Sequence, residues 1–168
     1  RKDITMANTT HLYLTANGTK IDGDSTILSM DRENSIECLS FEDSVRTARE
    51  ASSGMASGER TYEPLRITKR IDKASPMIAK ALCNNEVIEG TFKFYRPNPE
   101  GDGTTQHYFT VVIQEGRVGS VTRVSPDVID PAAANAPANE EVTFVFGYIA
   151  WTYEPDGIEH IDHWSQRT

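Results

Sequence analysis

Apolar and polar residues alternate with a period of two along most of the chain. Leu12, Leu14 and Ala16 alternate with more polar neighbours, and the Asn17-Gly18 pair that follows is typical of a tight hairpin turn. The same alternation recurs later, with inward-facing positions expected at Leu65, Ile67, Ile71, Ile88, Phe92, Phe94, Phe109, Val111 and Ile113. Because successive side chains of a strand point to opposite faces, the pattern predicts a series of half-buried β-strands.

The alternation changes phase at two places. Ile36 and Cys38 share one parity, whereas Leu39 and Phe41 share the other, so a β-bulge is expected near Cys38-Leu39. Beyond Gly116 the parity becomes ambiguous, which predicts a kink or a second bulge there. Bulges bend strands, and bent strands are what the wall of a barrel requires.

A single short helix is predicted after the strand that contains Ile67. Ser75 is suited to the N-cap and Pro76 to the first helical position, where no backbone donor is needed. Two i,i+4 pairs then form one apolar stripe, Met77 with Ala81 and Ile78 with Leu82. The Asn84-Asn85 pair can adopt the left-handed conformation that ends a helix.

The segment Val142–Tyr153 is apolar on both faces, so both faces are expected to be covered. One face suits the core; the helix, a loop or a neighbouring subunit could cover the other. Together these elements predict a mostly β fold, a closed or nearly closed β-barrel with one short α-helix packed on its side. We expect one domain over residues 6–168, with residues 1–5 a cloning remnant or an alternative start before Met6.

Two polar segments carry no periodicity. Ala48–Arg60 is small, polar and predicted to be a flexible loop, and loops of this length in compact domains are usually functional or disordered. Ser125–Asn139 holds three prolines and five alanines and is predicted to be an exposed connection.

Seventeen basic and twenty-five acidic residues give a net charge of −8, which argues against general nucleic-acid binding. One basic window runs from Arg60 to Lys73. It is either a solvated strand edge or a basic surface that meets an acidic one on another copy of the chain. The second alternative would use acidic residues near the C-terminus, namely Glu154, Asp156, Glu159 and Asp162.

The remaining composition limits the class of protein. No run of about eighteen apolar residues occurs, so neither a transmembrane helix nor membrane insertion is expected. No secretory signal peptide is visible. Cys38 and Cys83 fit no metal or redox spacing and are predicted to be small buried residues in a chain folded under reducing conditions.

Candidate chemistry is sparse. His160 and His163 would approach each other on a helix but point to opposite faces of a strand, so an exposed segment is favoured over a metal site. Asp22-Gly23-Asp24 begins like a calcium loop, but Ile27 stands where such a loop needs glycine. No nucleophile elbow, P-loop or dinucleotide motif is present. We therefore expect no enzyme, no metal and no cofactor.

Six blocks of sequence resemble the haemolysin-coregulated protein (Hcp) family, whose members are tube subunits of bacterial type VI secretion systems. The blocks are HLYLTANGTKIDG from His11, SIECLSFEDSV from Ser35, ITKRIDKASPMIAKALCNN from Ile67, EGTFKFYRPNP from Glu89, GRVGSVTRVSPD from Gly116 and EEVTFVFGYIAWTYE from Glu140. The KRIDKASP pattern before a short helix is fairly specific, and the order of the blocks is more so.

The resemblance implies hexameric rings that stack into a hollow tube, with effector proteins in its lumen. It also implies a contractile sheath and a spike protein as partners, assembly in the bacterial cytoplasm, and secretion without a cleaved signal peptide. By the same resemblance, the 48–60 loop reaches a neighbouring ring, with Ser53, Gly54 and Met55 as the candidate stacking residues at its tip.

Two other classes of function remain open from the residues alone. A small-molecule carrier barrel would need a roomy apolar interior and an open mouth. An enzyme, such as a hydrolase, would have to use scattered acidic residues with His107 or His160.

Overall fold

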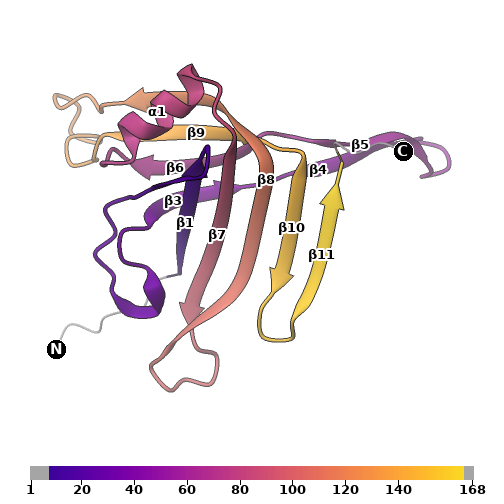
Figure 1. Ribbon diagram of the computed structural model, residues 1–168, viewed down its shortest axis with the longest axis horizontal. Helices are drawn as coiled ribbons and strands as arrows, with labels where there is room; N and C mark the ends of the chain where they lie inside the picture. Colours follow the sequence, from indigo (N-terminus) through magenta and orange to yellow (C-terminus); the bar gives the residue numbers. More distant parts are fainter. Residues whose placement is uncertain (1–7, 165–168) are drawn as a thin grey trace.

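The computed structural model describes residues 8–164, so the expectation for residues 1–5 lies outside the described residues. Its elements are β1 (Thr9–Ala16), β2 (Thr19–Ile21), β3 (Ile36–Glu42), β4 (Val45–Arg49), β5 (Ala56–Tyr62), β6 (Leu65–Arg70), α1 (Ser75–Cys83), β7 (Ile88–Pro97), β8 (Thr105–Val124), β9 (Asn139–Val145), β10 (Tyr148–Tyr153) and β11 (Ile158–His163). A short 3-10 helix spans Ser29–Asp31. Figure 1 shows mainly strands, with α1, the one α-helix among the described residues, at the upper edge of the view.

The strands close into a barrel. Neighbouring strands follow the order β8-β7-β1-β3-β6-β9, and a further antiparallel pairing of β9 with β8 completes the circle. The 20-residue β8 makes this closure possible because its first half pairs with β7 and β10 and its second half with β9. Strands β10 and β11 extend the sheet beyond the barrel, and α1 packs against β8. The predicted fold class is confirmed.

The inward-facing positions predicted from the alternation form most of the core. Leu12, Phe92 and Phe144 are fully buried, and Phe92 meets Phe144 edge-to-face with ring centroids 6.2 Å apart. Other core residues with no exposed surface are Ile36, Leu65, Ile67, Ile78, Ile88, Val111, Ile113, Val142 and Ile149. Burying so much apolar surface is the main force that holds the barrel together.

Both predicted irregularities are present. The β3–β6 register shifts between Cys38 and Ser40, which is the bulge that the phase change indicates. The β7–β8 register shifts next to Gly116, where a Cβ atom would lie 2.8 Å from the Ile88 side chain and 3.0 Å from its carbonyl oxygen. Gly116 is therefore needed for the close approach of two backbones at the bend of β8.

The segment Val142–Tyr153, predicted to be one strand, is two strands. β9 pairs with the second half of β8, and β10 pairs with the first half. The two strands are separated at Phe146-Gly147, opposite the bend of β8 near Gly116. The second apolar face is covered in part within the chain, since Trp151 stacks on Tyr62, with ring centroids 6.4 Å apart, whereas Val145 is 43% exposed. This cover comes from strand β5, which was not among the helix, loop and neighbouring subunit that the sequence left open.

The helix prediction is right in extent and wrong at its first residue. α1 spans Ser75–Cys83, and Asn85 has a positive φ of 49° just beyond its end. The N-cap is Ala74, without a side-chain hydrogen bond, and Ser75 is the first helical residue. The Ser75 hydroxyl donates instead to the buried Glu140 carboxylate, at 2.6 Å, because a buried charge binds it more strongly than a free helix amide.

Two other expectations about burial are wrong. Cys83, at the end of the helix, is exposed, while Cys38 is buried as predicted and its pKa is raised to about 12 by burial. Ile71 is 47% exposed because β6 ends at Arg70, so the alternation no longer applies to it.

Gly23 provides a test of how tightly the barrel wall is packed. A Cβ atom there would lie 2.5 Å from the carbonyl oxygen of Ser35, so Gly23→Ala should lower the free energy of unfolding by about 1–3 kcal/mol. Gly58→Ala is the matched control, because its Cβ would meet only Ala48, at 4.0 Å, and its effect should stay within about 0.5 kcal/mol. Urea unfolding at equal protein concentration measures both; equal stabilities for the two variants would contradict the close packing at Gly23.

Candidate functional site

A β-hairpin projects from the barrel where the sequence predicted a flexible loop. β4 and β5 pair only with each other in a separate two-stranded sheet, and Figure 1 shows them reaching away from the barrel. Every residue of β5 except Tyr62 is exposed. The loop prediction for Ala48–Arg60 is wrong because a strand with solvent on both faces has no alternation of apolar and polar residues to reveal it.

The predicted stacking residues Ser53, Gly54 and Met55 lie at the tip of this hairpin. Gly54 has a φ of 70°, and its amide donates to the Glu50 carbonyl at 2.8 Å. The Ser53 hydroxyl donates to the Glu50 carboxylate at 2.9 Å, and the Arg49 guanidinium donates to the Gly54 carbonyl at 3.2 Å. The tip is thus an ordered turn, and the Met55 side chain is 69% exposed on it.

The root of the hairpin is tied to the β10–β11 extension of the sheet. Arg60 donates two hydrogen bonds to Asp162, at 2.6 and 2.7 Å, and the Tyr62 hydroxyl donates to the same carboxylate. On the other strand, the Trp151 indole donates to Asp43 at 2.9 Å, immediately before β4. Asp43 and Asp162 therefore fix the direction in which the hairpin leaves the barrel.

We call these contacts of Asp43 and Asp162 the root clamp. It bears on the prediction that acidic residues near the C-terminus meet a basic surface on another copy. Asp162 pairs with Arg60 of its own chain, so it is not free to meet a basic surface on another copy. The hydrogen bonds from Arg60 hold the pKa of Asp162 below its ordinary value, with a further contribution from Tyr62. Burial and the Asp162 carboxylate together raise the pKa of Tyr62 to about 12, so the phenol stays a donor.

A buried ion cluster lies at the other end of β6. The Lys69 ammonium has no exposed surface and donates to Glu140 at 2.6 Å, Asp72 at 2.8 Å and Ser75 at 3.1 Å. Arg123 of β8 donates to the second oxygen of Glu140 at 2.8 Å. The prediction that the basic window is a solvated edge is wrong for Lys69, which is paired inside the protein.

The cluster was not predicted, yet the sequence held a signal for it. Lys69 has the same parity as Ile67, and Glu140 the same parity as Val142, so the strand alternation points both charges inward. They are directly opposite each other in the β6–β9 register. Burial alone would raise the pKa of Glu140, but the hydrogen bonds from Lys69 and Ser75 and the nearby positive charges outweigh it, and the pKa is lowered.

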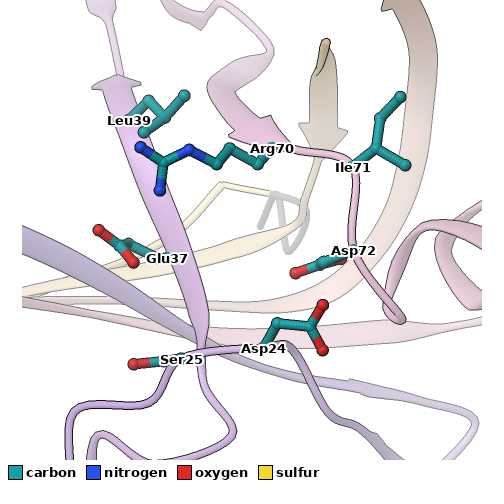
Figure 2. A pocket seen from close by; sticks show the side chains of 7 residues that line it. All are labelled: Asp24, Ser25, Glu37, Leu39, Arg70, Ile71 and Asp72. Carbon is teal, nitrogen blue, oxygen red and sulfur yellow. The ribbon is translucent and has the colours of Figure 1, made fainter. Parts of the chain in front are cut away.

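A surface pocket of about 130 Å³ opens beside this cluster, where β6 ends. Its lining includes four charged residues, Asp24, Glu37, Arg70 and Asp72, and the apolar residues Leu39 and Ile71. Asp72 is paired with Lys69 of the ion cluster. In Figure 2 the Arg70 guanidinium and Leu39 lie at one side of the view, and the Asp24 carboxylate lies at the other. Within residues 8–164, the other three charged residues, Asp24, Glu37 and Arg70, have no ion-pair partner closer than 4 Å.

The other candidate residues are not brought together. His160 stacks on Trp151, with ring centroids 6.0 Å apart, and His163 packs on Tyr148 from the other face of β11. Among the described residues, no three His, Cys, Asp or Glu side chains form a group that could hold a metal ion. No helix of the described chain is long and apolar enough to cross a membrane.

His107 takes part in a hydrogen-bonded chain that differs from a catalytic triad. The Thr110 hydroxyl donates to Glu154 at 2.6 Å and contacts the His107 Nε2 atom at 2.7 Å. In a triad the imidazole lies between the hydroxyl and the carboxylate, whereas here the hydroxyl lies between the other two. Burial lowers the pKa of His107.

The family is decided by comparison with known proteins. The family model described as "Type VI secretion system effector, Hcp" matches residues 13–153. The chain belongs to the Hcp family. Hcp proteins are structural, secreted tube proteins of the type VI secretion system, and theirs is not an enzyme family.

Individual Hcp proteins resemble the chain over nearly its whole length. The major exported protein of Pseudomonas aeruginosa is 28% identical over 162 residues, which cover 96% of this chain and 93% of that protein. A solved structure of Hcp1 from the E. coli EAEC 042 pathovar has a TM-score of 0.79 at 28% identity, covering 94% and 99% of the two chains. Secreted protein Hcp3 of Pseudomonas aeruginosa, at 22% identity, covers 96% of this chain and all of its own, and its TM-score of 0.70 supports the fold.

The ion cluster predicts a large loss of stability when one partner is removed. Glu140→Gln leaves the buried Lys69 ammonium without its carboxylate, so the free energy of unfolding should fall by about 3–5 kcal/mol at pH 7. Glu141→Gln is the matched control, because the Glu141 side chain is only half-buried and pairs with Arg66 at the surface, 3.4 Å away, where a change within about 1 kcal/mol is expected.

The same cluster predicts a dependence on pH. Because the folded pKa of Glu140 is lowered, its contribution is fully present above the ordinary value of 4.5 and is lost as the pH falls through the folded value. Denaturant titrations between pH 7 and pH 3 should show a smaller acid-induced loss in Glu140→Gln than in the unchanged chain. If the free energy of unfolding of the two proteins fell equally with pH, Glu140 would not be the group responsible for the acid-induced loss.

The clamp at the hairpin root predicts a local effect. Asp162→Asn keeps the shape but loses the charge that accepts from Arg60, so amide exchange in β4 and β5 should accelerate by about 10- to 100-fold. Exchange in barrel strands such as β1 should change little. Asp156→Asn, in the exposed β10–β11 turn, serves as the control, and equal exchange in both variants would show that the clamp does not order the hairpin.

Proposed function

We propose that the chain is the subunit of a hexameric ring that stacks with other rings into the hollow inner tube of a type VI secretion system. The observation that carries the proposal is the projecting β4–β5 hairpin. An isolated two-stranded sheet is marginally stable in water, and this one is exposed on nearly all positions of β5. Its tip is nevertheless ordered, which suits an element that another copy of the chain covers.

The barrel interior argues against the carrier alternative. Fully buried side chains fill it, including Leu12, Phe92 and Phe144, whereas a carrier of small molecules needs an apolar cavity with an open mouth. A filled barrel instead gives a rigid subunit, which is what a repeating wall needs.

The wider role follows from the family. We expect the tube to form in the bacterial cytoplasm, to carry effector proteins in its lumen, and to be driven out with a sheath around it and a spike protein at its tip. Secretion would then depend on the type VI machine and not on a cleaved signal peptide. Self-association is expected to need no cofactor.

The first experiment is light scattering on a sizing column, with negative-stain images of the same peak. A mass near six subunits and annular particles would support the ring. A chain that stays monomeric at high concentration would overturn the proposal and return attention to the carrier alternative.

The exposed methionine at the hairpin tip provides a test of stacking. Met55→Asp places a charge where an apolar contact is expected, so rings should form normally while tubes decrease by about tenfold or more. Met77→Asp, at a 40% exposed methionine on α1, is the control and should stack as the unchanged chain does. Particle counts in electron micrographs compare the two; tubes that persist in Met55→Asp would remove the tip from the stacking contact.

A further inference from the structure

The pocket at the end of β6 offers three kinds of contact to a partner. The carboxylates of Asp24 and Glu37 provide negative charge, the guanidinium of Arg70 provides positive charge, and Leu39 and Ile71 are apolar and 44% and 47% exposed. Charges of both signs that lack ion-pair partners in the described chain favour an occupant that itself carries both signs. The exposed apolar side chains favour an occupant with an apolar group beside those charges.

The hairpin tip carries the complementary groups within seven residues. Arg49 and Glu50 are adjacent and exposed, and the Met55 side chain is 69% exposed beside them. The backbone hydrogen bond from the Glu50 amide to the Met55 carbonyl, at 2.8 Å, holds the three side chains on one turn. An ordered turn loses little conformational freedom when it docks.

The two surfaces cannot meet within one chain. The hairpin leaves the barrel just before β6 begins at Leu65, whereas the pocket lies where β6 ends, at Arg70. Figure 1 shows the β4–β5 hairpin at the right of the view and the end of β6 at the left, on the opposite side of the molecule. A contact between the tip and the pocket therefore joins two copies head to tail, which produces a closed ring or an open stack.

We propose that the hairpin tip of one copy seats in the β6-end pocket of the next copy. Arg49 faces Asp24 and Glu37, Glu50 faces Arg70, and Met55 packs on Leu39 and Ile71. This inference rests on the proposed function and names the receptor for the hairpin, which the family assignment leaves open. The occupant is a second copy because both complementary surfaces belong to the same chain.

Charge reversal tests the pairing. Arg49→Glu and Glu37→Arg should each reduce the head-to-tail assemblies seen by light scattering and negative stain by about tenfold or more, since like charges then face each other. The double variant, with both changes in one chain, should recover assembly to within about twofold. Glu89→Arg, an exposed residue on β7, is the control for the change in net charge. If the double variant assembles no better than the single ones, the pairing is wrong.

Cysteine cross-linking tests the apolar contact and separates this inference from the proposed function. In a Cys83→Ser background, Met55→Cys combined with Ile71→Cys should give a ladder of covalent oligomers on mild oxidation. Variants with only one of the two new cysteines should give no ladder. A ladder that continues beyond six chains is expected, because the tip joins one ring to the next. A ladder that stops at six would place the contact within the ring and overturn the stacking role of the tip.

The negative outcomes are distinct. Rings and tubes without a ladder would overturn the seating of the tip in this pocket and leave the tube function intact. A chain without rings or tubes, before any substitution, would overturn both. Full assembly by Glu37→Arg would show that a different partner, or none, occupies the pocket.

Discussion

The buried pair of Lys69 and Glu140 is the interaction on which the rest of the structure depends. It lies across β6 and β9, so it closes one seam of the barrel. The same carboxylate accepts from Ser75 of α1 and from Arg123 of β8, and the same ammonium binds Asp72 in the turn between β6 and the helix. Four segments of the chain are therefore joined at one buried carboxylate, and each partner offsets part of the cost of removing the charges from water.

β6 connects this cluster to both surfaces of the proposed contact. The hairpin root at Tyr62 lies just before its first residue, and the pocket at Arg70 and Ile71 lies at its end. Since Leu65 and Ile67 are fully buried between these points, the strand is held rigidly along its length. The distance between a subunit's hairpin and its own pocket is thus fixed by the core, and a repeating assembly needs such a fixed spacing.

The alternation of apolar and polar residues predicted the strands that bury one face in the core. The phase change at Cys38 located a bulge, and Gly116 located the bend of β8, because each alters a periodicity that the core imposes. The β4–β5 hairpin left no such trace, since both of its faces meet solvent. The bond from Arg60 to Asp162 joins residues 102 apart in sequence, and composition gave only the sign of their charges. The pocket is equally non-local, because β3, β6 and the 22–28 segment meet there only in the folded barrel.

The root clamp lowers the entropy cost of docking the hairpin on another copy of the chain. A free ribbon of this length would lose about 1–2 kcal/mol of backbone entropy per residue when a partner ordered it, which would offset much of a modest contact. Asp162 and Asp43 order the root inside the subunit, before any second copy arrives. Much of the ordering is then part of folding, and the contact energy of the tip is left for association. Repetition of one small preorganised contact around a ring and along a stack can in this way hold an assembly that no single contact would hold.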